Sequence, residues 1–385
     1  MNYQSICGIE GVSAAGIKEG KFGLAIIHAE GTAAGVFTTN LVRAAPVELM
    51  RRQIKRGRLE AIIANSGCAN AYTGKRGYAD ALAMANAAGE VLGTNPARIG
   101  VASTGVIGRY LDLPLITRQC RDIVPALASS PDAEAAAAKA IMTTDTFQKH
   151  ALIRRETFSV AGIAKGSGMI APNMGTMLAF LYTDARISAG FLKKALRLVA
   201  KRTFNRIVVD GDTSTNDMAL CTATGIAGNV PYGEFCAALE SCCRSLAIQI
   251  ARDGEGATKL LEVTVKGAPD EERAARVART VIESPLVKTA VYGEDPNWGR
   301  VIAAAGRAGV KFDPGAVSLS IGDGSVDHPL VTNGEIIADL HKAKQVMKGK
   351  SVVFTLDLAE GEGEATGWGC DLTEKYVEIN GRYTT

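Results

Sequence analysis

The sequence predicts a layered α/β fold, and three of its features support this prediction. Strand-like and helix-like segments alternate along the 385 residues, as in sheets that are covered by helices. Apolar residues make up 47% of the chain, which is enough to bury a substantial core. Its 42 glycines gather in short polar blocks at the ends of strand-like runs, where loops of α/β proteins build their sites.

Short apolar runs rich in β-branched residues predict the strands. In chain order they are FGLAII (22–27), AIIA (61–64), IGVAST (99–104), MLAFLYT (177–183), RIVVD (206–210), LLEVTV (260–265) and VVFTLDL (352–358). Helical patterns lie between them at 78–93, 132–142, 190–202 and 232–252. In the last of these, Phe235, Leu239, Cys242, Leu246 and Ile250 share one face, so we expect that face to be buried.

Charge and hydropathy exclude several classes of partner. The formal net charge is only +3, from 43 basic and 40 acidic residues, which argues against nucleic acid or an anionic membrane as the main partner. No run of about 18 apolar residues suggests a membrane span. The first residues, MNYQSICGIEGV, lack the basic start and apolar centre of a secretory signal, so we expect a cytoplasmic protein. The length predicts two subdomains or one large α/β unit.

Cysteine and histidine usage indicates chemistry that needs neither metal nor imidazole. The eight cysteines show no C-x-x-C spacing, so we expect small buried side chains rather than disulfides or ligands. The four histidines lie far from one another and from the cysteines. A zinc site needs convergent ligands of these types, so we predict no metal site.

The dipeptide Gly175-Thr176 offers a nucleophile. The Thr176 hydroxyl can attack the preceding carbonyl, shift the acyl group from nitrogen to oxygen and, after hydrolysis, leave Thr176 as a new N-terminus. Its α-amine, with a pKa near 7.7–8.0, can then act as the base for its own hydroxyl. Gly175 places no side chain beside the scissile carbonyl. From the chemistry alone, a plain turn entering the strand at 177–183 remains the alternative.

The block around this dipeptide resembles a known family. KGSGMIAPNMGTMLAF (165–180) is similar to the motif of the ornithine acetyltransferases, the bifunctional glutamate N-acetyltransferases of arginine biosynthesis. The family's other blocks follow in the same order, as NSG-x-ANA-x-TG, STGVIG, TTDT, DGDTSTND, DGEGATK, GEDPNWGR and EINGRYTT. The resemblance runs from about residue 7 to the last residue.

The resemblance implies a reaction, a fold and an assembly. The family cuts itself before the matching Thr, which implies an α fragment of 1–175 and a β fragment of 176–385 that begins with the nucleophile Thr176. The implied fold is the layered α/β fold shared with DmpA-like N-terminal-nucleophile enzymes, with a smaller C-terminal α/β region. The implied substrates are N-acetylornithine and glutamate, and the implied assembly is α2β2. No cofactor is expected, and acetyl-CoA stays open as a second acetyl donor.

Acyl transfer needs donors aimed at a tetrahedral oxyanion. STGVIG follows a strand-like run, so the Thr104 hydroxyl and the Gly105 amide can point at one spot, although a plain strand-ending turn is the alternative. The resemblance assigns the oxyanion hole to these two residues. It also implies substrate contacts by Thr143 or Thr144, with Thr143 preferred, and by Lys165, Glu255, Asn380 and the last residue, Thr385.

The alternative is a helix cap for the Thr pair, a cap or solvated charge for Glu255 and a surface position for Lys165. For Asn380 and Thr385 the alternative is a disordered tail. Two positions depart from the family pattern. Gly175 stands where the family usually has Ala, and this difference could change the rate of cleavage. Cys68 stands where the family usually has Asn, and this difference could change the hydrogen-bond support of the site. The aspartates of DGDTSTND lack the spacing of a calcium loop, and we expect a hydrogen-bonded structural loop instead.

KGSGMIA and GEGATK likewise lack the two glycine-rich phosphate-binding motifs, the dinucleotide fingerprint and the P-loop, which argues against motif-based nucleotide binding. Two further functions compete with the acetyltransferase. One is an N-terminal-nucleophile amidase or aminopeptidase, in which water replaces the glutamate amine as acceptor. The other is an amino-acid-binding protein that never cleaves itself. An intact-mass measurement separates the last hypothesis from the two enzymes.

Overall fold

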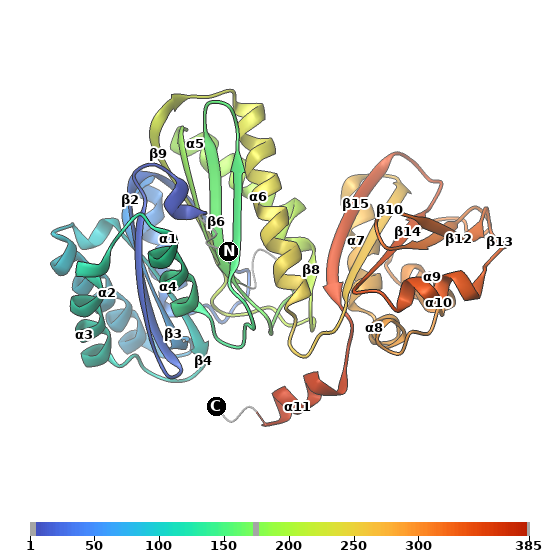
Figure 1. Cartoon of the computed structure of the whole chain (residues 1–385), viewed down its shortest axis with the longest axis horizontal. Coiled ribbons are helices and arrows are strands. Elements are labelled where there is room, and N and C mark those ends of the chain that lie inside the picture. Colours follow the sequence, from blue (N-terminus) through green and yellow to red (C-terminus); the bar gives the residue numbers. More distant parts are fainter. Residues whose placement is uncertain (1–4, 172–176, 383–385) are drawn as a thin grey trace. The chain divides into compact units, whose positions relative to one another are not determined.

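The computed structural model describes residues 5–171 and 177–382, and the chain divides into two compact units (Figure 1). The first unit comprises Met1–Asn205 and Asp212–Leu246, and the second comprises Arg206–Gly211 and Ala247–Thr385. The first unit therefore contains chain from both sides of the expected cleavage position. The predicted fragments 1–175 and 176–385 therefore do not coincide with the two units, and cleavage between them stays a prediction.

The first unit is built on an eight-stranded sheet with the order β4-β3-β2-β9-β7-β6-β5, and β1 pairs with β2. The strands are β1 (Ser13–Glu19), β2 (Phe22–Phe37), β3 (Arg58–Cys68), β4 (Ile99–Val106), β5 (Lys149–Arg154), β6 (Ser159–Lys165), β7 (Leu178–Arg186) and β9 (Met218–Asn229). The pairs β3–β4 and β7–β9 are parallel, and the others are antiparallel.

Strand β2 connects the two halves of this sheet. Its residues 23–28 pair with β3, and after an irregularity between His28 and Gly31 its residues 32–37 pair with β9. Such an irregularity bends a strand. Apolar side chains of both halves pack in one core, in which Ile27 of β2 belongs to the same buried cluster as Phe180 of β7. The sheet therefore folds back on itself, and the two halves share one interior.

Side-chain alternation along β2 separates this shared interior from a second core. Ala25 and Ile27 belong to the shared interior, whereas Leu24 and Ile26 face a core formed with α2 and α3. The helices of the first unit are α1 (Ala45–Gln53), α2 (Gly74–Leu92), α3 (Leu113–Ile123), α4 (Pro131–Ile141) and α5 (Ala189–Arg202), followed by α6 (Tyr232–Arg252), which runs on into the second unit. Phe235, Leu239, Cys242, Leu246 and Ile250 of α6 are all fully buried, as predicted.

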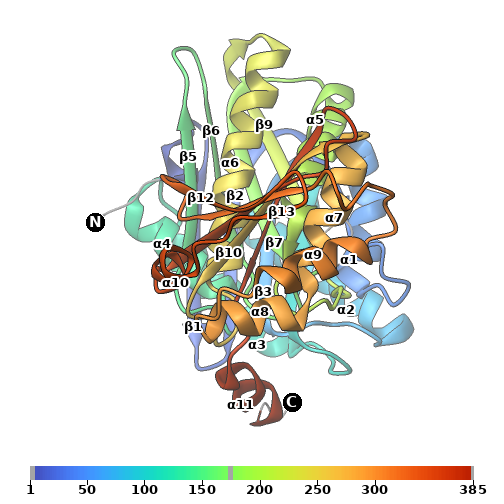
Figure 2. The ribbon, with the colours of Figure 1, turned by 90° about the vertical axis from the view of Figure 1, so that its right-hand side faces the viewer.

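The second unit contains a seven-stranded sheet with the order β13-β12-β11-β14-β10-β15-β8. Its strands are β8 (Ile207–Val208), β10 (Leu260–Ala268), β11 (Ser318–Gly322), β12 (Asp327–Thr332), β13 (Glu335–Ile336), β14 (Ser351–Asp357) and β15 (Gly363–Cys370), and its helices are α7 (Glu271–Glu283), α8 (Pro285–Tyr292), α9 (Trp298–Gly306), α10 (Leu340–Met347) and α11 (Glu374–Arg382). Helix α7 packs on β10 and β15, and α8 and α9 lie beside it (Figure 2).

The mixed α/β class predicted from the sequence is confirmed, and each predicted strand and helix coincides with an element of the structure. Strands with few β-branched residues were missed, such as β9, and so were short helices such as α9. All eight cysteines are free and seven are buried, in agreement with their predicted role. Within the described residues, no helix combines the length and apolarity that a bilayer crossing requires.

Candidate active site

The ends of the parallel strands β3 and β4 touch through their backbones. Gly105 has a φ of 130°, and a Cβ at this position would lie 2.4 Å from the carbonyl carbon of Gly67 and 2.6 Å from the amide nitrogen of Cys68. Only glycine permits this approach. The preceding residue, Thr104, is 9% exposed. The segment predicted as an oxyanion loop is therefore a tight strand-to-strand contact rather than an open turn.

Lys165 lies at the end of β6 and reaches Thr104 across the shared interior. Its Nζ donates a hydrogen bond of 3.2 Å to Thr104 Oγ1, and its side chain is largely buried. A hydroxyl that accepts from an ammonium group keeps its own proton for another acceptor. The structure thus brings together two residues predicted separately, and it leaves the Thr104 hydroxyl able to donate.

Asp145 joins Lys165 to the loop that carries Thr143. Its Oδ1 accepts hydrogen bonds from Lys149 Nζ at 2.7 Å and from the Gly166 amide at 2.6 Å, and its Oδ2 accepts from the Thr143 amide at 3.0 Å. Thr143 is half-buried and follows the end of α4, and the next element is β5, so this cluster caps no helix. Asp145 therefore fixes the backbone on both sides of the candidate site.

Neighbouring charges and hydrogen bonds together affect the pKa of Asp145 more than its burial does. Burial alone would raise the pKa of this carboxyl, but the charges of Lys165 and Lys149 and the hydrogen bonds from Lys149 and Gly166 lower the pKa to about 2. Lys18 Nζ donates to Ser66 Oγ at 2.7 Å and to the carbonyl of Met142. Burial and the charge of Lys165 lower the pKa of Lys18. Cations crowded in this way suit a ligand that brings its own carboxylate.

The residues on either side of the expected nucleophile, Ala171 and Met177, are hydrogen-bonded to residues 212–218. The amide of Ala171 donates to the carbonyl of Asp212, and Thr213 Oγ1 donates to the carbonyl of Ala171 at 2.9 Å. At the other end, the amide of Met218 donates to the carbonyl of Met177. Gly175 and Thr176 themselves lie outside the described residues, so their predicted roles stay predictions.

Asn216 ties the loops of the site together. Its Nδ2 donates to the carbonyl of Ala69 at 2.6 Å and to that of Ser103 at 2.8 Å, next to Thr104. The carbonyl of Asp217 accepts from the amide of Thr38. The DGDTSTND block therefore includes the expected hydrogen-bonded structural loop. Among the residues that the structure describes, no group of three or more potential metal ligands forms.

Cys68 supports the loop that follows β4. Its Sγ donates to the carbonyl of Arg109 at 3.3 Å, and burial raises the pKa of the thiol. This position, where the resemblance leads one to expect Asn, is therefore occupied by a thiol, which forms weaker hydrogen bonds than an amide.

Glu255 and Asn380, two predicted substrate contacts, meet in the second unit. Glu255 Oε2 accepts a hydrogen bond of 2.9 Å from Asn380 Nδ2, and Asn380 is exposed on α11. Gly256 (φ 72°) lets α11 begin close by, because a Cβ there would lie 2.6 Å from the Tyr376 amide nitrogen. The end of the chain was predicted to be ordered, and α11 is a helix through Arg382. Thr385 lies outside the described residues.

Sequence reasoning missed the three residues that organise the site. Asp145 was treated only as part of a capping cluster, Asn216 as part of an acidic loop, and Lys18 was not considered. The detectable signal for Asp145 is an acid four residues before Lys149, the first residue of β5. The carbonyls bound by Asn216 Nδ2 and the groups bound by Lys18 Nζ are 48 to 147 residues away along the chain, so no local pattern reveals them.

Comparison with known proteins gives consistent matches along the chain. The model described as the ArgJ family matches residues 10–385. The glutamate N-acetyltransferase of Methanosarcina mazei is 51% identical over 388 residues, which cover 99% of this chain and 98% of that protein. The arginine biosynthesis bifunctional protein ArgJ of Symbiobacterium thermophilum is 53% identical over 365 residues, with 92% of this chain and 89% of that protein covered.

A solved structure agrees with these sequence matches. The crystal structure of the arginine biosynthesis bifunctional protein ArgJ from Bacillus halodurans is 43% identical in sequence and superposes with a TM-score of 0.51. The superposition covers 54% of this chain and 100% of the crystallised one.

Proposed function

Because the chain belongs to the ArgJ family, we propose that it transfers an acetyl group from N-acetylornithine to glutamate in arginine biosynthesis, through an ester on Thr176. The observation that carries this proposal is the hydrogen bond from Lys165 Nζ to Thr104 Oγ1, beside the tight contact at Gly105. It leaves the Thr104 hydroxyl able to donate, and we assign the second donor that acyl transfer requires to the Gly105 amide.

The first reaction in this proposal is self-cleavage. Thr176 Oγ attacks the carbonyl carbon of Gly175, the C–N bond breaks, and the acyl group moves to oxygen. Water then hydrolyses the ester, which frees Gly175 as a carboxylate and Thr176 as an amine. The anchoring of Ala171 and Met177 on the loop 212–218 supports this step, because it fixes both ends of the reacting segment.

The second reaction is acetyl transfer in two halves. Thr176 Oγ attacks the acetyl carbonyl of N-acetylornithine while the Thr176 amine takes the hydroxyl proton. The oxyanion accepts hydrogen bonds from Thr104 and Gly105, and the proton passes to ornithine as it leaves. The amine of glutamate then attacks the acetyl ester, and N-acetylglutamate leaves as Thr176 regains its proton. Each donor to the oxyanion contributes on the order of 3 kcal/mol.

The predicted substrate contacts form two groups. In the first unit, Lys165 and the loop at Thr143 provide a cation and polar groups, and Asp145 keeps both in place. In the second unit, Glu255 provides a carboxylate for an ammonium group, with Asn380 hydrogen-bonded to it. We assign substrate contact to these residues and to Thr385.

The finer parts of the proposal concern assembly and donors. We infer an α2β2 assembly of the cleaved fragments in the cytoplasm, with no cofactor. Acetyl-CoA stays open as a second acetyl donor, because its thioester and the amide of N-acetylornithine present the same acetyl carbonyl to Thr176.

Intact-mass measurement and labelling test the proposal together. We expect purified protein to consist of two fragments, the second beginning Thr-Met-Leu-Ala-Phe, and expect [acetyl-¹³C]N-acetylornithine to label Thr176. Thr176→Ala should remain a single chain without label, whereas the matched variant Thr176→Ser should still cleave. The proposal would be refuted if the unmodified protein were a single uncut chain and Thr176→Ala transferred acetyl groups at the same rate. Acetate released at the same rate with and without glutamate would instead identify a hydrolase.

A further inference from the structure

A basic groove lies in the first unit between α1 and α5, and its lining contains none of the residues placed in the proposed mechanism. Its floor is the second half of β2, from Ala33 to Phe37, and its walls are α1 with the short helix Ile54–Arg56 on one side and α5 on the other. The cavity has a volume of about 670 Å³, which lies within the range of small-molecule sites.

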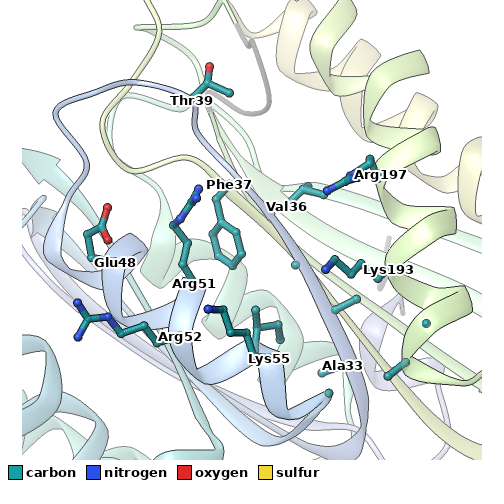
Figure 3. Close-up of a pocket in the computed structure, with 16 residues that line it drawn as sticks. Ala33, Val36, Phe37, Thr39, Glu48, Arg51, Arg52, Lys55, Lys193 and Arg197 are labelled. Carbon is teal, nitrogen blue, oxygen red and sulfur yellow. The ribbon is translucent and has the colours of Figure 1, made fainter.

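The charge of the groove is strongly biased. Figure 3 shows Lys193 and Arg197 extending from α5, across β2 from the basic residues of α1. The lining includes five basic residues and one acid, a formal charge of five minus one, or +4, whereas the whole chain carries only +3. The basic residues are Arg51, Arg52, Lys55, Lys193 and Arg197. Two walls separated by more than a hundred residues of sequence thus contribute charge of the same sign.

These cations are not neutralised by the protein. None of the five has a carboxylate partner within residues 5–171 and 177–382. The single acid of the lining, Glu48, is 3.4 Å from Arg43, which lies outside the lining. Arg52 is held against Tyr78, with its guanidinium 5.2 Å from the ring centroid. Like charges that converge on a concave surface raise its electrostatic potential and favour a multiply charged anion.

The shape of the floor indicates what else the anion carries. Ala33, Gly35 and Val36 are small or apolar, and Phe37, the last residue of β2, adds an aromatic ring to the lining. Inorganic phosphate would leave most of this volume empty. We propose that the groove binds a nucleoside diphosphate group, with its phosphates on Lys193, Arg197 and Arg51 and its nucleoside on the β2 floor.

A free nucleotide and a coenzyme that contains the same group are the two sources of this chemistry. The site is built from side chains on two helices and contains no glycine-rich phosphate loop, which explains why sequence motifs gave no indication of it. Arg and Lys side chains bind phosphate oxygens through charge-assisted hydrogen bonds, so a phosphate site does not require a backbone loop.

Calorimetric titration of the full chain with ADP, acetyl-CoA and pyrophosphate tests the proposal. We expect ADP to bind with a Kd that rises with salt concentration, and pyrophosphate to bind at least tenfold more weakly. Equal affinities for ADP and acetyl-CoA would identify the shared group as the ligand, and tighter binding of either would identify the source. Absence of ADP binding at millimolar concentration, or pyrophosphate binding as tightly as ADP, would overturn the proposal.

Two adjacent lysines on α5 provide a matched control. Lys193 lines the groove and Lys194 does not, yet both are exposed on the same helix. Lys193→Glu should raise the Kd for ADP at least tenfold and Lys194→Glu at most twofold, with acetyl transfer from N-acetylornithine unchanged in both. On the opposite wall, Arg51→Glu and Arg56→Glu form the equivalent pair. Equal effects within each pair would show general charge attraction and refute a site.

The same variants decide whether another copy of the chain occupies the groove. Light scattering of Lys193→Glu and Arg51→Glu should give the mass of the unmodified assembly. A fall in mass confined to the groove variants would show that a subunit interface covers this surface, and the proposed ligand site would be wrong.

Discussion

The two groups of predicted site residues are built in opposite ways. In the first unit, Thr104, Lys165 and Asp145 are nearly buried and held by several hydrogen bonds to other strands and loops. In the second unit, Glu255 and Asn380 are partly or fully exposed, and one hydrogen bond of 2.9 Å connects them. A buried charge without its partner costs several kcal/mol, whereas an exposed pair contributes little.

This difference separates two tasks. A group that stabilises a developing charge must be in place before the reaction, and in the proposed mechanism the buried network has this role. A group that recognises a soluble amino acid can stay solvated until the ligand arrives. We therefore expect changes in the first group to affect stability and kcat together, and changes in the second to affect KM alone.

Replacement of Gly105 by Ala should have the largest effect. The new Cβ would overlap the backbone of Gly67, and a φ of 130° is strained for any residue with a side chain. We expect acetyl transfer to fall about 10³-fold, because a displacement of this size misaligns both oxyanion donors. Steady-state rates measure the loss. Gly233→Ala is the control, since Gly233 has open space around it and no positive φ, and a comparable loss there would contradict the explanation.

Asp145→Asn should destabilise the first unit by about 3 kcal/mol, because it removes the charge of a buried carboxylate that is ion-paired with Lys149. Urea unfolding followed by fluorescence measures the change. Glu30→Gln removes the carboxylate of an exposed pair with Arg58 and should cost less than about 1 kcal/mol. Equal costs for the two variants would show that burial does not distinguish them.

Thr104→Val should lower kcat about 10²-fold and the free energy of unfolding by about 1–3 kcal/mol, because valine keeps the shape of threonine but removes the buried hydroxyl that accepts from Lys165. Single-turnover transfer of labelled acetyl to Thr176 measures the chemical step directly. Thr104→Ser, which retains the hydroxyl, should recover most of the rate. If serine were as slow as valine, the hydroxyl would not be the donor.

The stability of the protein should depend on pH through Asp145. Its pKa is lowered in the folded state to about 2, from the ordinary value of 3.8. Its contribution is therefore fully present above about pH 4 and is lost as the pH falls through 2, in total about 2 kcal/mol. Unfolding at pH 5, 4 and 3 should show the difference between the unmodified protein and Asp145→Asn becoming smaller. A constant difference over this range would contradict the lowered pKa.

Asn380→Ala should have the smallest effect, raising the KM for substrate by about tenfold, with an unfolding free energy changed by less than about 0.5 kcal/mol. The side chain is exposed and its removal creates no cavity. Initial rates at varied substrate concentration measure KM. A fall in kcat with KM unchanged would assign Asn380 to the reaction rather than to recognition.

Local pattern and long-range contact account for what the sequence could and could not predict. The buried face of α6 follows from the spacing of Phe235 and Leu239, and the strand that begins at Leu178 follows from its apolar run. The contact between Lys165 and Thr104 does not, because it depends on the fold of the sheet about β2. Asp145 and Asn216 escaped for the same reason, since their role lies in partners brought close by distant strands.

The position of β9 has a consequence for when the enzyme matures during its synthesis. Strand β9 lies between β2 and β7, and it supplies the Met218 amide that holds Met177. A nascent chain that ends before residue 218 therefore lacks the strand that joins the two halves of the catalytic unit. In the proposed mechanism, scission then waits until translation has passed β9, so a molecule whose first unit is incomplete stays uncut.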